Sequence, residues 1–386
     1  MHPLEKLRGH FASVDCVVCP VGIRCGIVGL PNVGKSTLFN AITASSQAAA
    51  ENYPFCTIEP NTGVVPVPDD RITQLTSLVN PAREVPATIE FVDIAGLVKG
   101  AAQGEGLGNQ FLAHIRDVDA IAHVARAFDD PNVIHVDGSI DPRRDIEVVE
   151  TELILKDLET LDKKQDAAQR KGKTGDAKAR AETDFYTRLR EHLSNGRLAR
   201  YFPRVNEEEE LWLREMHLLT AKPMLYVANT DEHGVTDGNE YVEAIRAIAE
   251  KEGARAVPIC AKIEMELVEL PEAERAEFLR ELGLKEPGLN ALVRAAYDLL
   301  GLQTYFTAGP KEVRAWTVRK GAKAPEAAAV IHTDFEKGFI RAEVMKFSDF
   351  IRLKSEAAVR EAGLLRSEGR EYIVEDGDVM HFRFNV

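Results

Sequence analysis

The sequence predicts an α/β protein in three parts. These are a mostly parallel sheet covered by helices, a helical hairpin inserted into it, and a small α+β domain at the C-terminus. Short apolar runs alternate with stretches of helical spacing over most of the 386 residues. This alternation stops between residues 143 and 220, and the composition changes again after residue 303. With 45% hydrophobic and 28% charged residues, most of the chain can bury a core.

The alternating part begins with an apolar strand at 23–29, a glycine-bearing turn and a helical stretch, LFNAITA. Further strands are predicted at 88–93, 118–125, 223–228 and 255–260. Helices are predicted at 238–252, 271–283 and 288–300. Strands that alternate with helices favour a parallel sheet with helices on both faces.

Residues 143–219 predict an antiparallel helical arm. Two apolar stripes flank the polar stretch KGKTGDAKA; they comprise Ile146, Val149, Leu153, Leu158 and Leu161 before it and Phe185, Leu189 and Leu193 after it. The chain carries a net charge of −14, but Lys163 to Arg200 holds 11 Lys/Arg against 5 Asp/Glu. A basic arm on an acidic protein can contact RNA, although a solvated charged face is an equally good interpretation.

The last segment, 303–386, contains four β-like runs, VRAWTV, FIRAEV, REYIVEDGD and VMHFRFNV. A helix near 347–361 lies among them. This mixture predicts the small α+β domain.

No apolar run reaches the roughly 18 residues needed to cross a bilayer, and residues 1–20 do not resemble a signal peptide. The five cysteines, Cys16, Cys19, Cys25, Cys56 and Cys260, are odd in number and scattered. This argues against a disulfide framework and for a reducing compartment. We therefore expect a soluble cytoplasmic protein with no membrane partner.

Residues Gly29–Thr37, GLPNVGKST, fit the phosphate-binding pattern G-x-x-x-x-G-K-[ST] between a strand and a helix. Backbone N–H groups of such a loop surround a phosphate, and the helix N-terminus adds positive charge. Lys35 is predicted to bind the β- and γ-phosphate oxygens, and Ser36 to offer a hydroxyl to Mg²⁺. A dinucleotide-binding turn would have different glycine spacing and would not need the Lys-Ser pair.

Asp93 to Gly96, DIAG, follows the strand predicted at 88–93. A carboxylate at this position can hold Mg²⁺ and the glycine can approach the γ-phosphate, as in other phosphoryl-transfer sites. Thr57 lies between the first helix and the strand that follows that helix. It is predicted to bind magnesium only while the triphosphate is present, and Thr62 is a competing candidate. The predicted magnesium set is thus Ser36, Thr57 and Asp93.

A guanine-specific site carries Asn-Lys-x-Asp, but this chain has Asn229-Thr230-Asp231-Glu232. The lysine is absent and the aspartate position holds a glutamate, so guanine preference should be weak. Cys260-Ala261-Lys262 occupies the position of the second base-contact loop. ATP is the predicted substrate, and a GTPase in which Glu232 or Asp231 still binds guanine is the alternative.

Leu97 follows Gly96, where Ras-like proteins keep a glutamine that orients water. A leucine cannot do this. His135 is a candidate replacement because the ordinary pKa of a histidine side chain, near neutrality, suits water positioning, although an ordinary loop histidine is an equally good interpretation. His114 and His123 are expected to be helix or core residues. The predicted catalytic residues are Lys35 and His135.

The motifs together resemble the YchF/Obg-like ATPase family of the TRAFAC class. The similarity runs from about residue 21 to the C-terminus and is carried by Gly29–Thr37, NYPFCTIEPNTGVV, FVDIAGLVKGAAQGEGLGNQFL, Asn229-x-x-Glu232, AKIEMEL and EYIVEDGDVMHFRFNV. The resemblance implies an OBG-type G domain at 21–142 and 220–302. It also implies a coiled-coil insertion at 143–219 and a TGS domain with a β-grasp fold at 303–386.

The resemblance further implies ATP hydrolysis with Mg²⁺ and stimulation by K⁺, for which Asn32 matches the potassium-holding loop residue. It implies association with the ribosome through the arm and the TGS domain, ribosomal RNA as a further partner, and a part in translation or stress regulation. A backbone contact to adenine is implied at Thr230. The expected ATP-binding residues are Asn32, Val33, Gly34, Lys35, Ser36, Thr37, Asn229, Thr230, Glu232, Cys260, Ala261 and Lys262.

Val21 stands where the family usually begins with methionine, so residues 1–20 are predicted to be a start-site artefact. Two rival functions stay open besides the GTPase. One is a ribosome- or RNA-binding adaptor in which nucleotide only stabilises the fold. The other, a small-molecule kinase, is disfavoured because Asp93-x-x-Gly96 and the Thr57 segment belong to hydrolases.

Overall fold

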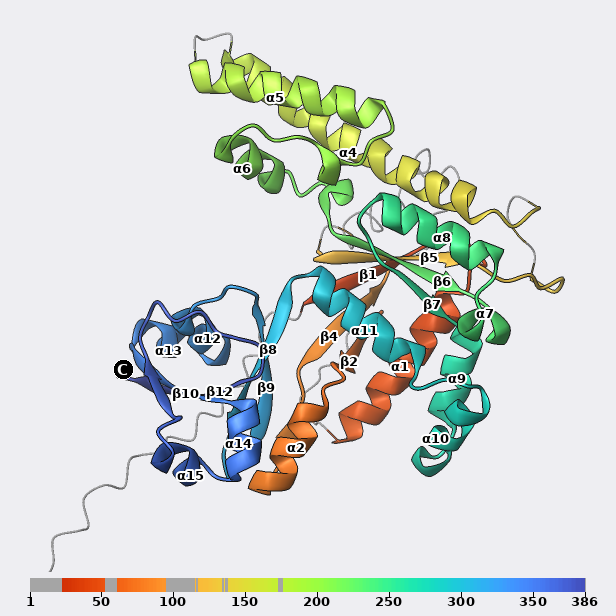
Figure 1. The fold of residues 1–386 in the computed structure, drawn as a ribbon. Helices are drawn as coiled ribbons and strands as arrows, with labels where there is room; N and C mark the ends of the chain where they lie inside the picture. Colours follow the sequence, from red (N-terminus) through yellow and green to blue (C-terminus); the bar gives the residue numbers. More distant parts are fainter. Residues whose placement is uncertain are drawn as a thin grey trace, which may run out of the picture.

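A computed structural model describes residues 23–52, 61–94, 115, 117–133, 135, 138–172 and 176–385, with the backbone alone described for 48–52. Its elements form a central α/β sheet, a projecting helical arm and a C-terminal α+β domain (Figure 1). The predicted fold class is therefore confirmed. Residues 1–20, and with them Cys16 and Cys19, lie outside the described part of the chain.

The central sheet has six strands in the order β2-β4-β1-β5-β6-β7. All neighbours are parallel except β2 and β4. The strands are β1 (Arg24–Val28), β2 (Thr62–Pro66), β4 (Thr88–Asp93), β5 (Ala120–Arg126), β6 (Met224–Asn229) and β7 (Ala256–Ile259). Strand β1 lies between β4 and β5. In a parallel sheet with this arrangement, a ligand crevice opens at the carboxyl edge of the strands.

Helices cover both faces of this sheet (Figure 1). The covering helices are α1 (Lys35–Asn52) and α11 (Gly288–Leu299) on one face and α4 (Pro142–Gly172) and α8 (Glu240–Lys251) on the other. Three shorter helices lie beyond β7: α7 (Glu232–Thr236), α9 (Ala261–Glu269) and α10 (Glu272–Glu281). The helices predicted at 238–252, 271–283 and 288–300 are each found, with ends shifted by at most two residues.

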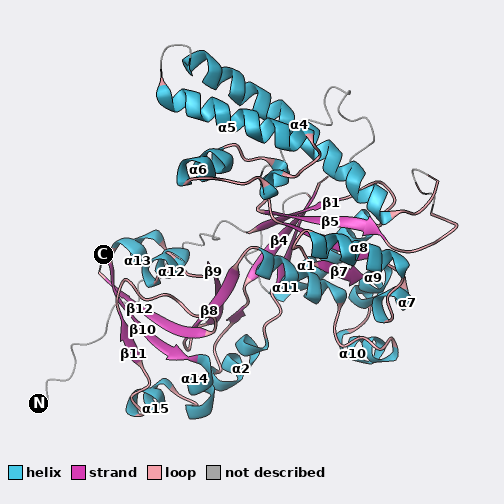
Figure 2. Ribbon diagram, turned by 45° about the horizontal axis from the view of Figure 1, so that its top comes forward, coloured by secondary structure: helices cyan, strands magenta, loops and turns pink. Residues whose placement is uncertain are grey.

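The arm consists of α4, α5 (Ala177–Ser194), η2 (Ala199–Tyr201), α6 (Glu207–Glu215) and η3 (Leu219–Ala221). At 31 residues, α4 is about 46 Å long and runs from the sheet to the tip of the arm beside α5 (Figure 2). Its apolar stripe serves two cores. Ile146 and Val149 pack in the core of the sheet, whereas Leu161 packs with Phe185 and Trp212 inside the arm. One rigid helix therefore joins the two bodies.

Charged groups meet where the arm joins the sheet. The Tyr226 hydroxyl lies 2.9 Å from Glu150 Oε1 and 2.7 Å from Glu252 Oε2. A hydroxyl carries one proton and can donate to only one of them, so the other contact requires a protonated carboxyl. The guanidinium of Arg200 is 2.6 Å from Glu252 and 4.0 Å from Glu150. The close cation therefore belongs to Glu252, which leaves Glu150 as the carboxyl that takes up a proton. Burial and the neighbouring Glu252 charge raise the pKa of Glu150 to about 7.

This proton makes the junction sensitive to pH. The unfolded chain has an ordinary Glu pKa near 4.5, so between about pH 4.5 and 7 the native state holds the extra proton. The stabilisation of the native state by protonated Glu150 is present below the pKa of the unfolded chain, and it is lost as pH rises through the pKa that Glu150 has in the folded chain. We expect the free energy of unfolding to fall by on the order of 2–3 kcal/mol over that window, and Glu150→Gln to remove most of this slope. Urea denaturation at a series of pH values measures it.

Glu159→Gln is the matched control, because Glu159 is an exposed glutamate on the same helix whose charge is paired with Lys156 rather than directed at Glu150. It should keep the pH slope of the unmodified chain. If Glu150→Gln also kept that slope, the assignment of the proton would be wrong.

The C-terminal domain is built on a second sheet in the order β11-β10-β12-β8-β9-β3. Its own strands are β8 (Leu302–Ala308), β9 (Val313–Arg319), β10 (Phe339–Lys346), β11 (Arg366–Glu368) and β12 (Asp378–Phe384). Its helices are α12 (Ala324–Ile331), α13 (Thr333–Lys337), α14 (Phe347–Leu353) and α15 (Glu356–Glu361). Tyr305, Trp316 and Met380 are among the residues of its separate core.

Two details of this domain differ from the sequence prediction. The helix expected near 347–361 is two helices, because Lys354 adopts a left-handed backbone (φ 65°) and Ser355 caps α15. The run REYIVEDGD forms a loop rather than a strand, since the side chain of Asp378 accepts bonds from the Tyr372 hydroxyl (2.6 Å) and the Glu375 amide (2.9 Å). Side-chain bonds thus replace the backbone ladder that a strand would need.

The C-terminal domain is fastened to the central sheet. The sixth strand of its sheet, β3 (Glu84–Val85), comes from the segment between α2 (Asp70–Val79) and β4 and pairs parallel to β9. Arg71 of α2 makes a two-pronged ion pair with Asp376 at 2.7 and 3.2 Å. The domain is therefore held against α2.

Candidate nucleotide-binding site

The predicted phosphate loop lies between the end of β1 and the start of α1, at the carboxyl edge of the central sheet. Asn32 and Gly34 both have left-handed backbones, with φ of 61° and 88°. A Cβ at Gly34 would lie 2.0 Å from Asn229 Nδ2, and one at Gly29 would lie 2.6 Å from the carbonyl oxygen of Val124. Any side chain at either position would push the loop away from its neighbours, so both glycines are required by packing.

Asn229 holds this loop from behind. Its Nδ2 donates to the carbonyl of Val33 (2.8 Å), and its Oδ1 accepts from the amide of Ala261 (3.1 Å). The side chain is 5% exposed, and these two bonds use both ends of its amide. Asn229 therefore connects the phosphate loop to the loop after β7, and it acts by positioning both.

Lys35 forms an ion pair with Asp93, which ends β4 next to β1. The lysine is 8% exposed, and its ammonium is therefore held inside the loop rather than in solvent. Ser36 and Thr37 follow in the first turn of α1 and are exposed. The sheet thus brings together the cation, one carboxylate and the hydroxyls that the sequence assigns to phosphate and magnesium.

These donors fit Mg²⁺, which prefers hard oxygen ligands and keeps several waters and phosphate oxygens in its coordination shell. Within the described ranges there is no cluster of three or more His, Cys, Asp or Glu side chains that could hold a metal without a nucleotide. The third predicted ligand, Thr57, lies outside the described residues, as do Gly96, Leu97, Cys56 and His114.

Thr230 is buried beside the loop that follows β5. Its amide donates to the carbonyl of Ile259 (2.8 Å) and its hydroxyl to the carbonyl of Ala127 (3.0 Å). Asn239 donates from Nδ2 to the same carbonyl (2.8 Å) and to the Thr230 hydroxyl (3.0 Å). The sequence analysis did not predict a role for Asn239. Because the Thr230 N–H is already bonded, any backbone contact from this residue to a base must use its carbonyl oxygen.

The two acidic residues after Thr230 have different partners. Asp231 caps α7 by accepting from the amide of Gly234 (2.7 Å). Glu232 lies 3.4 Å from Lys262 Nζ, and both side chains are largely exposed. This hydrogen bond raises the pKa of Lys262. The pair thus joins the segments that follow β6 and β7, while Cys260 is a buried thiol whose pKa is raised by burial.

His135 lies against the first turn of α4. Its Nε2 is 2.8 Å from Asp145 Oδ2, and the two side chains are 7% and 3% exposed. The buried Arg126 at the end of β5 donates to the backbone carbonyls of the same loop, at Phe128, Asp130 and Val133. His135 thus lies in an anchored loop with Asp145 as a partner. The sequence analysis did not identify Arg126 as the anchor of this loop. The available signal was a cation at the end of an apolar strand, because a buried guanidinium requires several acceptors nearby. His123, by contrast, is buried in β5, as expected for a core residue.

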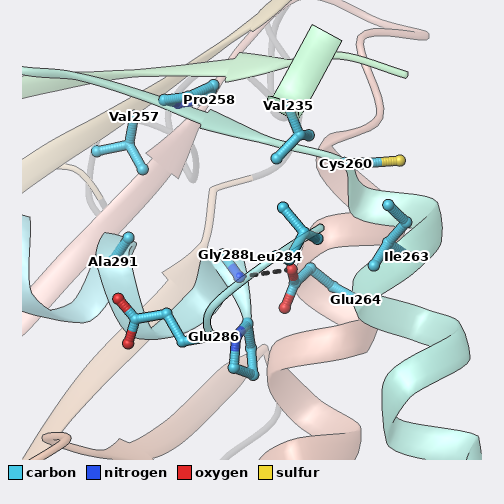
Figure 3. A pocket seen from close by; sticks show the side chains of 11 residues that line it. Val235, Val257, Pro258, Cys260, Ile263, Glu264, Leu284, Glu286, Gly288 and Ala291 are labelled. Carbon is cyan, nitrogen blue, oxygen red and sulfur yellow. Dashed lines mark hydrogen bonds between the residues drawn. The ribbon is translucent and has the colours of Figure 1, made fainter. Parts of the chain in front are cut away.

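A cavity of about 170 Å³ lies under the loop that carries Cys260 (Figure 3). Its lining is mostly apolar, and the Glu264 carboxylate beside it accepts from the Gly288 amide (2.7 Å) at the start of α11. No phosphate-loop residue lines it. It is also smaller than the roughly 300 Å³ from which ligand pockets usually begin. The cavity therefore lies beneath the loop that follows β7 and apart from the predicted phosphate loop.

Comparison with known proteins adds to this geometry. Residues 24–169 match the family MMR_HSR1, described as a 50S ribosome-binding GTPase, and residues 302–385 match YchF-GTPase_C, described as a protein of unknown function. The Ribosome-binding ATPase YchF of Escherichia coli O157:H7 is 56% identical over 366 residues, which are 95% of this chain and 100% of that protein. The chain belongs to the YchF family. The family resemblance expected from the motifs is thus confirmed.

Other members of the family agree. The Bacillus subtilis protein of the same name is 54% identical over 368 residues, 95% of this chain and 100% of its own. The solved structure of the Schizosaccharomyces pombe YchF GTPase matches with a TM-score of 0.83 and 39% identity, covering 94% of this chain and 98% of that one. Among the described residues, no helix is long and apolar enough to span a bilayer.

Proposed function

We propose that this chain is a ribosome-associated P-loop ATPase that hydrolyses ATP to ADP and phosphate as a nucleotide-dependent switch in translation or stress regulation. The family's nucleotide-hydrolase domain, and the ribosome-binding ATPases among its relatives, support the class of function. The observation that carries the proposal is the ion pair of Lys35 and Asp93 inside a phosphate loop held by Asn229.

The chemistry follows from this pair. A triphosphate bound in the loop would take Asp93's place as the partner of Lys35, so the lysine would neutralise β- and γ-phosphate charge and the carboxylate would become available to hold Mg²⁺. Mg²⁺, when bound, adds positive charge on the transferring phosphate. We propose Ser36, Asp93 and Thr57 as its protein ligands and Asn32 as a potassium ligand. The remaining loop residues, Val33, Gly34 and Thr37, bind phosphate through their backbone.

Adenine selection follows from Thr230 and its neighbours. A carbonyl oxygen accepts from the exocyclic amine of adenine and repels O6 of guanine, which is also an acceptor. The GTPase alternative needs Asp231 or Glu232 to accept guanine N1–H, but Asp231 already caps α7 through Oδ1 and Glu232 lies beside Lys262, which disfavours that alternative. We propose that Ala261, Cys260 and the Glu232–Lys262 pair line the base, and that Asn229 supports them from behind.

His135 remains the candidate for orienting the attacking water, in place of the glutamine of Ras-like proteins. Its contact with Asp145 supports a role that depends on the nucleotide state, because Nε2 could orient a water only after it had left Asp145. Movement at Asp145 would be passed along α4, the helix shared by both cores, to the arm. We propose 21–142 and 220–302 as the nucleotide-binding domain, 143–219 as the arm and 303–386 as the TGS domain, with arm and TGS domain contacting the ribosome.

Competition between nucleotides tests the proposal. We expect ATP to displace a fluorescent ATP analogue from the purified chain at least about tenfold better than GTP does, which corresponds to about 1.4 kcal/mol. We also expect turnover to require Mg²⁺ and to rise with K⁺ and with ribosomes. GTP binding tenfold tighter than ATP would instead favour the GTPase. Intact ribosome binding without any turnover would favour the adaptor.

A further inference from the structure

Residues 70–85 leave the central sheet and pack with the C-terminal domain. This segment consists of α2 and β3. Helix α2 packs against β8, β9 and α14 (Figure 1). Its two buried apolar side chains, Ile72 and Leu75, lie in one core with Phe306 and Val313 of that domain. Since β3 also adds a strand to the C-terminal sheet, the segment belongs to the C-terminal body although it precedes β4 in the chain.

Polar contacts close the seam between β3 and β9. The amide of Ala82 donates to the carbonyl of Pro310 (3.0 Å), and the amide of Val313 donates to the carbonyl of Arg83 (3.1 Å). Arg83 also forms an ion pair with Glu312, in which Nη2 lies 2.6 Å from Oε2. The two side chains are 50% and 26% exposed, so either can be changed without opening the core.

A two-stranded ribbon, β2 and β4, connects this segment to the nucleotide site. The two strands pair antiparallel along their whole length. Hydrogen bonds prolong the ribbon at both ends, from the Asp93 amide to the Asn61 carbonyl (2.9 Å) and from the Val67 amide to the Ala87 carbonyl (2.7 Å). At the usual rise of a strand, the ribbon spans about 20 Å between Asp93 and the C-terminal body.

The joints between the ribbon and the C-terminal body are short and stiff. Only Pro68 and Asp69 separate Val67 from α2, and only Pro86 separates β3 from Ala87. Proline fixes its own φ, and Asp69 is held as the cap of α2. In the central sheet β2 is an edge strand, with β4 as its neighbour. The position of the ribbon therefore depends on its support in the C-terminal body.

We propose that the C-terminal domain positions Asp93 for Mg²⁺ through this ribbon. The proposal rests on the proposed function, which makes Asp93 a magnesium ligand. A carboxylate that is held in place before the metal arrives loses little conformational entropy on binding. When the seam between β3 and β9 is loosened, the ribbon and Asp93 gain freedom, so Mg²⁺ strengthens ATP binding less. By linkage, Mg²⁺ and ATP together tighten the seam. Arg83 and Glu312 are then positioning residues.

Charge reversal across the seam tests this positioning. Arg83→Glu sets two carboxylates against each other, and Glu312→Arg sets two guanidiniums against each other. For each, the ratio of ATP affinity in Mg²⁺ to that in EDTA should fall about two- to fivefold, the range expected from losing an exposed ion pair. Affinity in EDTA should not change. The double exchange restores opposite charges and should restore the ratio, whereas a second substitution would not rescue a misfolded chain. Titration of the full chain with a fluorescent ATP analogue measures both affinities.

Arg190→Glu is the matched control. Arg190 and Asp162 also form a half-exposed ion pair between two elements, but these are the helices of the arm. This variant should keep the Mg²⁺ ratio of the unmodified chain. Hydrogen exchange followed by mass spectrometry gives a second measurement, independent of the variants. Peptides covering residues 82–85 and 310–315 should exchange more slowly with ATP and Mg²⁺ than with ATP and EDTA.

The outcomes separate this coupling from the proposed function. If Arg83→Glu and Glu312→Arg kept the ratio of the unmodified chain, or if Mg²⁺ with ATP left exchange at the seam unchanged, the coupling would be refuted. Magnesium-dependent ATP binding by the unmodified chain would then still support the proposed function. If the unmodified chain bound ATP equally well with Mg²⁺ and with EDTA, both the coupling and the magnesium site of the proposed function would be refuted.

Discussion

Replacing Lys35 by methionine is expected to reduce ATP turnover by at least about 100-fold, the usual effect of removing one charge-stabilising donor from a transition state. Methionine keeps the length of the buried stem but removes the ammonium that pairs with Asp93. Affinity for ATP should fall by on the order of 2–5 kcal/mol, because the triphosphate loses a desolvated cation. Single-turnover kinetics and equilibrium titration measure the two effects separately.

Lys346→Met is the matched control for this substitution. Lys346 also pairs with an aspartate, Asp378, at 2.8 Å, but it lies in the C-terminal domain. It should leave turnover unchanged. Asp93→Asn should keep much of the nucleotide affinity while losing its dependence on Mg²⁺. A Lys35→Met chain that retained more than a tenth of the turnover would show that phosphate charge is neutralised elsewhere.

The second large effect is on stability, at the base of the arm. The buried carboxylate of Asp157 on α4 accepts from the amides of Leu219 (2.7 Å) and Thr220 (2.8 Å) and from the Thr220 hydroxyl (2.6 Å). It thereby ties the outgoing helix of the arm to the returning chain just before β6. Asp157→Ala would leave these buried donors without their acceptor, so we expect it to destabilise the arm by about 3–5 kcal/mol.

The chain's two tryptophans provide the measurement. Trp212 lies in the core of the arm and Trp316 in that of the C-terminal domain. In a Trp316→Phe background, fluorescence during urea denaturation reports on the arm alone. Asp162→Ala is the control: Asp162 is on the same helix but is half exposed and pairs with Arg190. It should cost less than about 1 kcal/mol. Equal midpoints for the two variants would contradict the role given to Asp157.

Much of the fold could be predicted because it depends on local patterns. The strands and helices of the central sheet follow from apolar periodicity, and the phosphate loop follows from glycines whose spacing only one backbone shape explains. REYIVEDGD shows the limit of this reasoning. Its composition suits a strand, yet Asp376 of this segment reaches Arg71, 305 residues away in sequence, and Asp378 bonds the loop from within. Whether side-chain bonds of this kind or the backbone hydrogen bonds of a strand will form cannot be predicted from a few consecutive residues.

The predicted site divides in the same way. Lys35 and Asp93 could be predicted because each belongs to a short motif with a known chemical role. The structure brings the two side chains together in an ion pair. Asn229 was predicted to contact nucleotide, which stays a prediction; what the structure adds is that its amide bridges two backbone segments of the protein. Asn239, Arg126 and Asp145 belong to no motif. Thr57, Gly96 and Leu97 lie outside the described residues, so their roles stay predictions.

By itself, the sequence determined the family and the order of the main elements, and it predicts the residues that a triphosphate would meet, because each of these depends on residue type and spacing along the chain. Only the tertiary structure decided how the three bodies are joined. It showed one helix shared by two cores, a glutamate with a raised pKa at the junction of arm and sheet, and a strand given to the C-terminal sheet. Each of these is a contact between segments far apart in the chain, and its free energy comes from burial and charge that exist only once those segments meet.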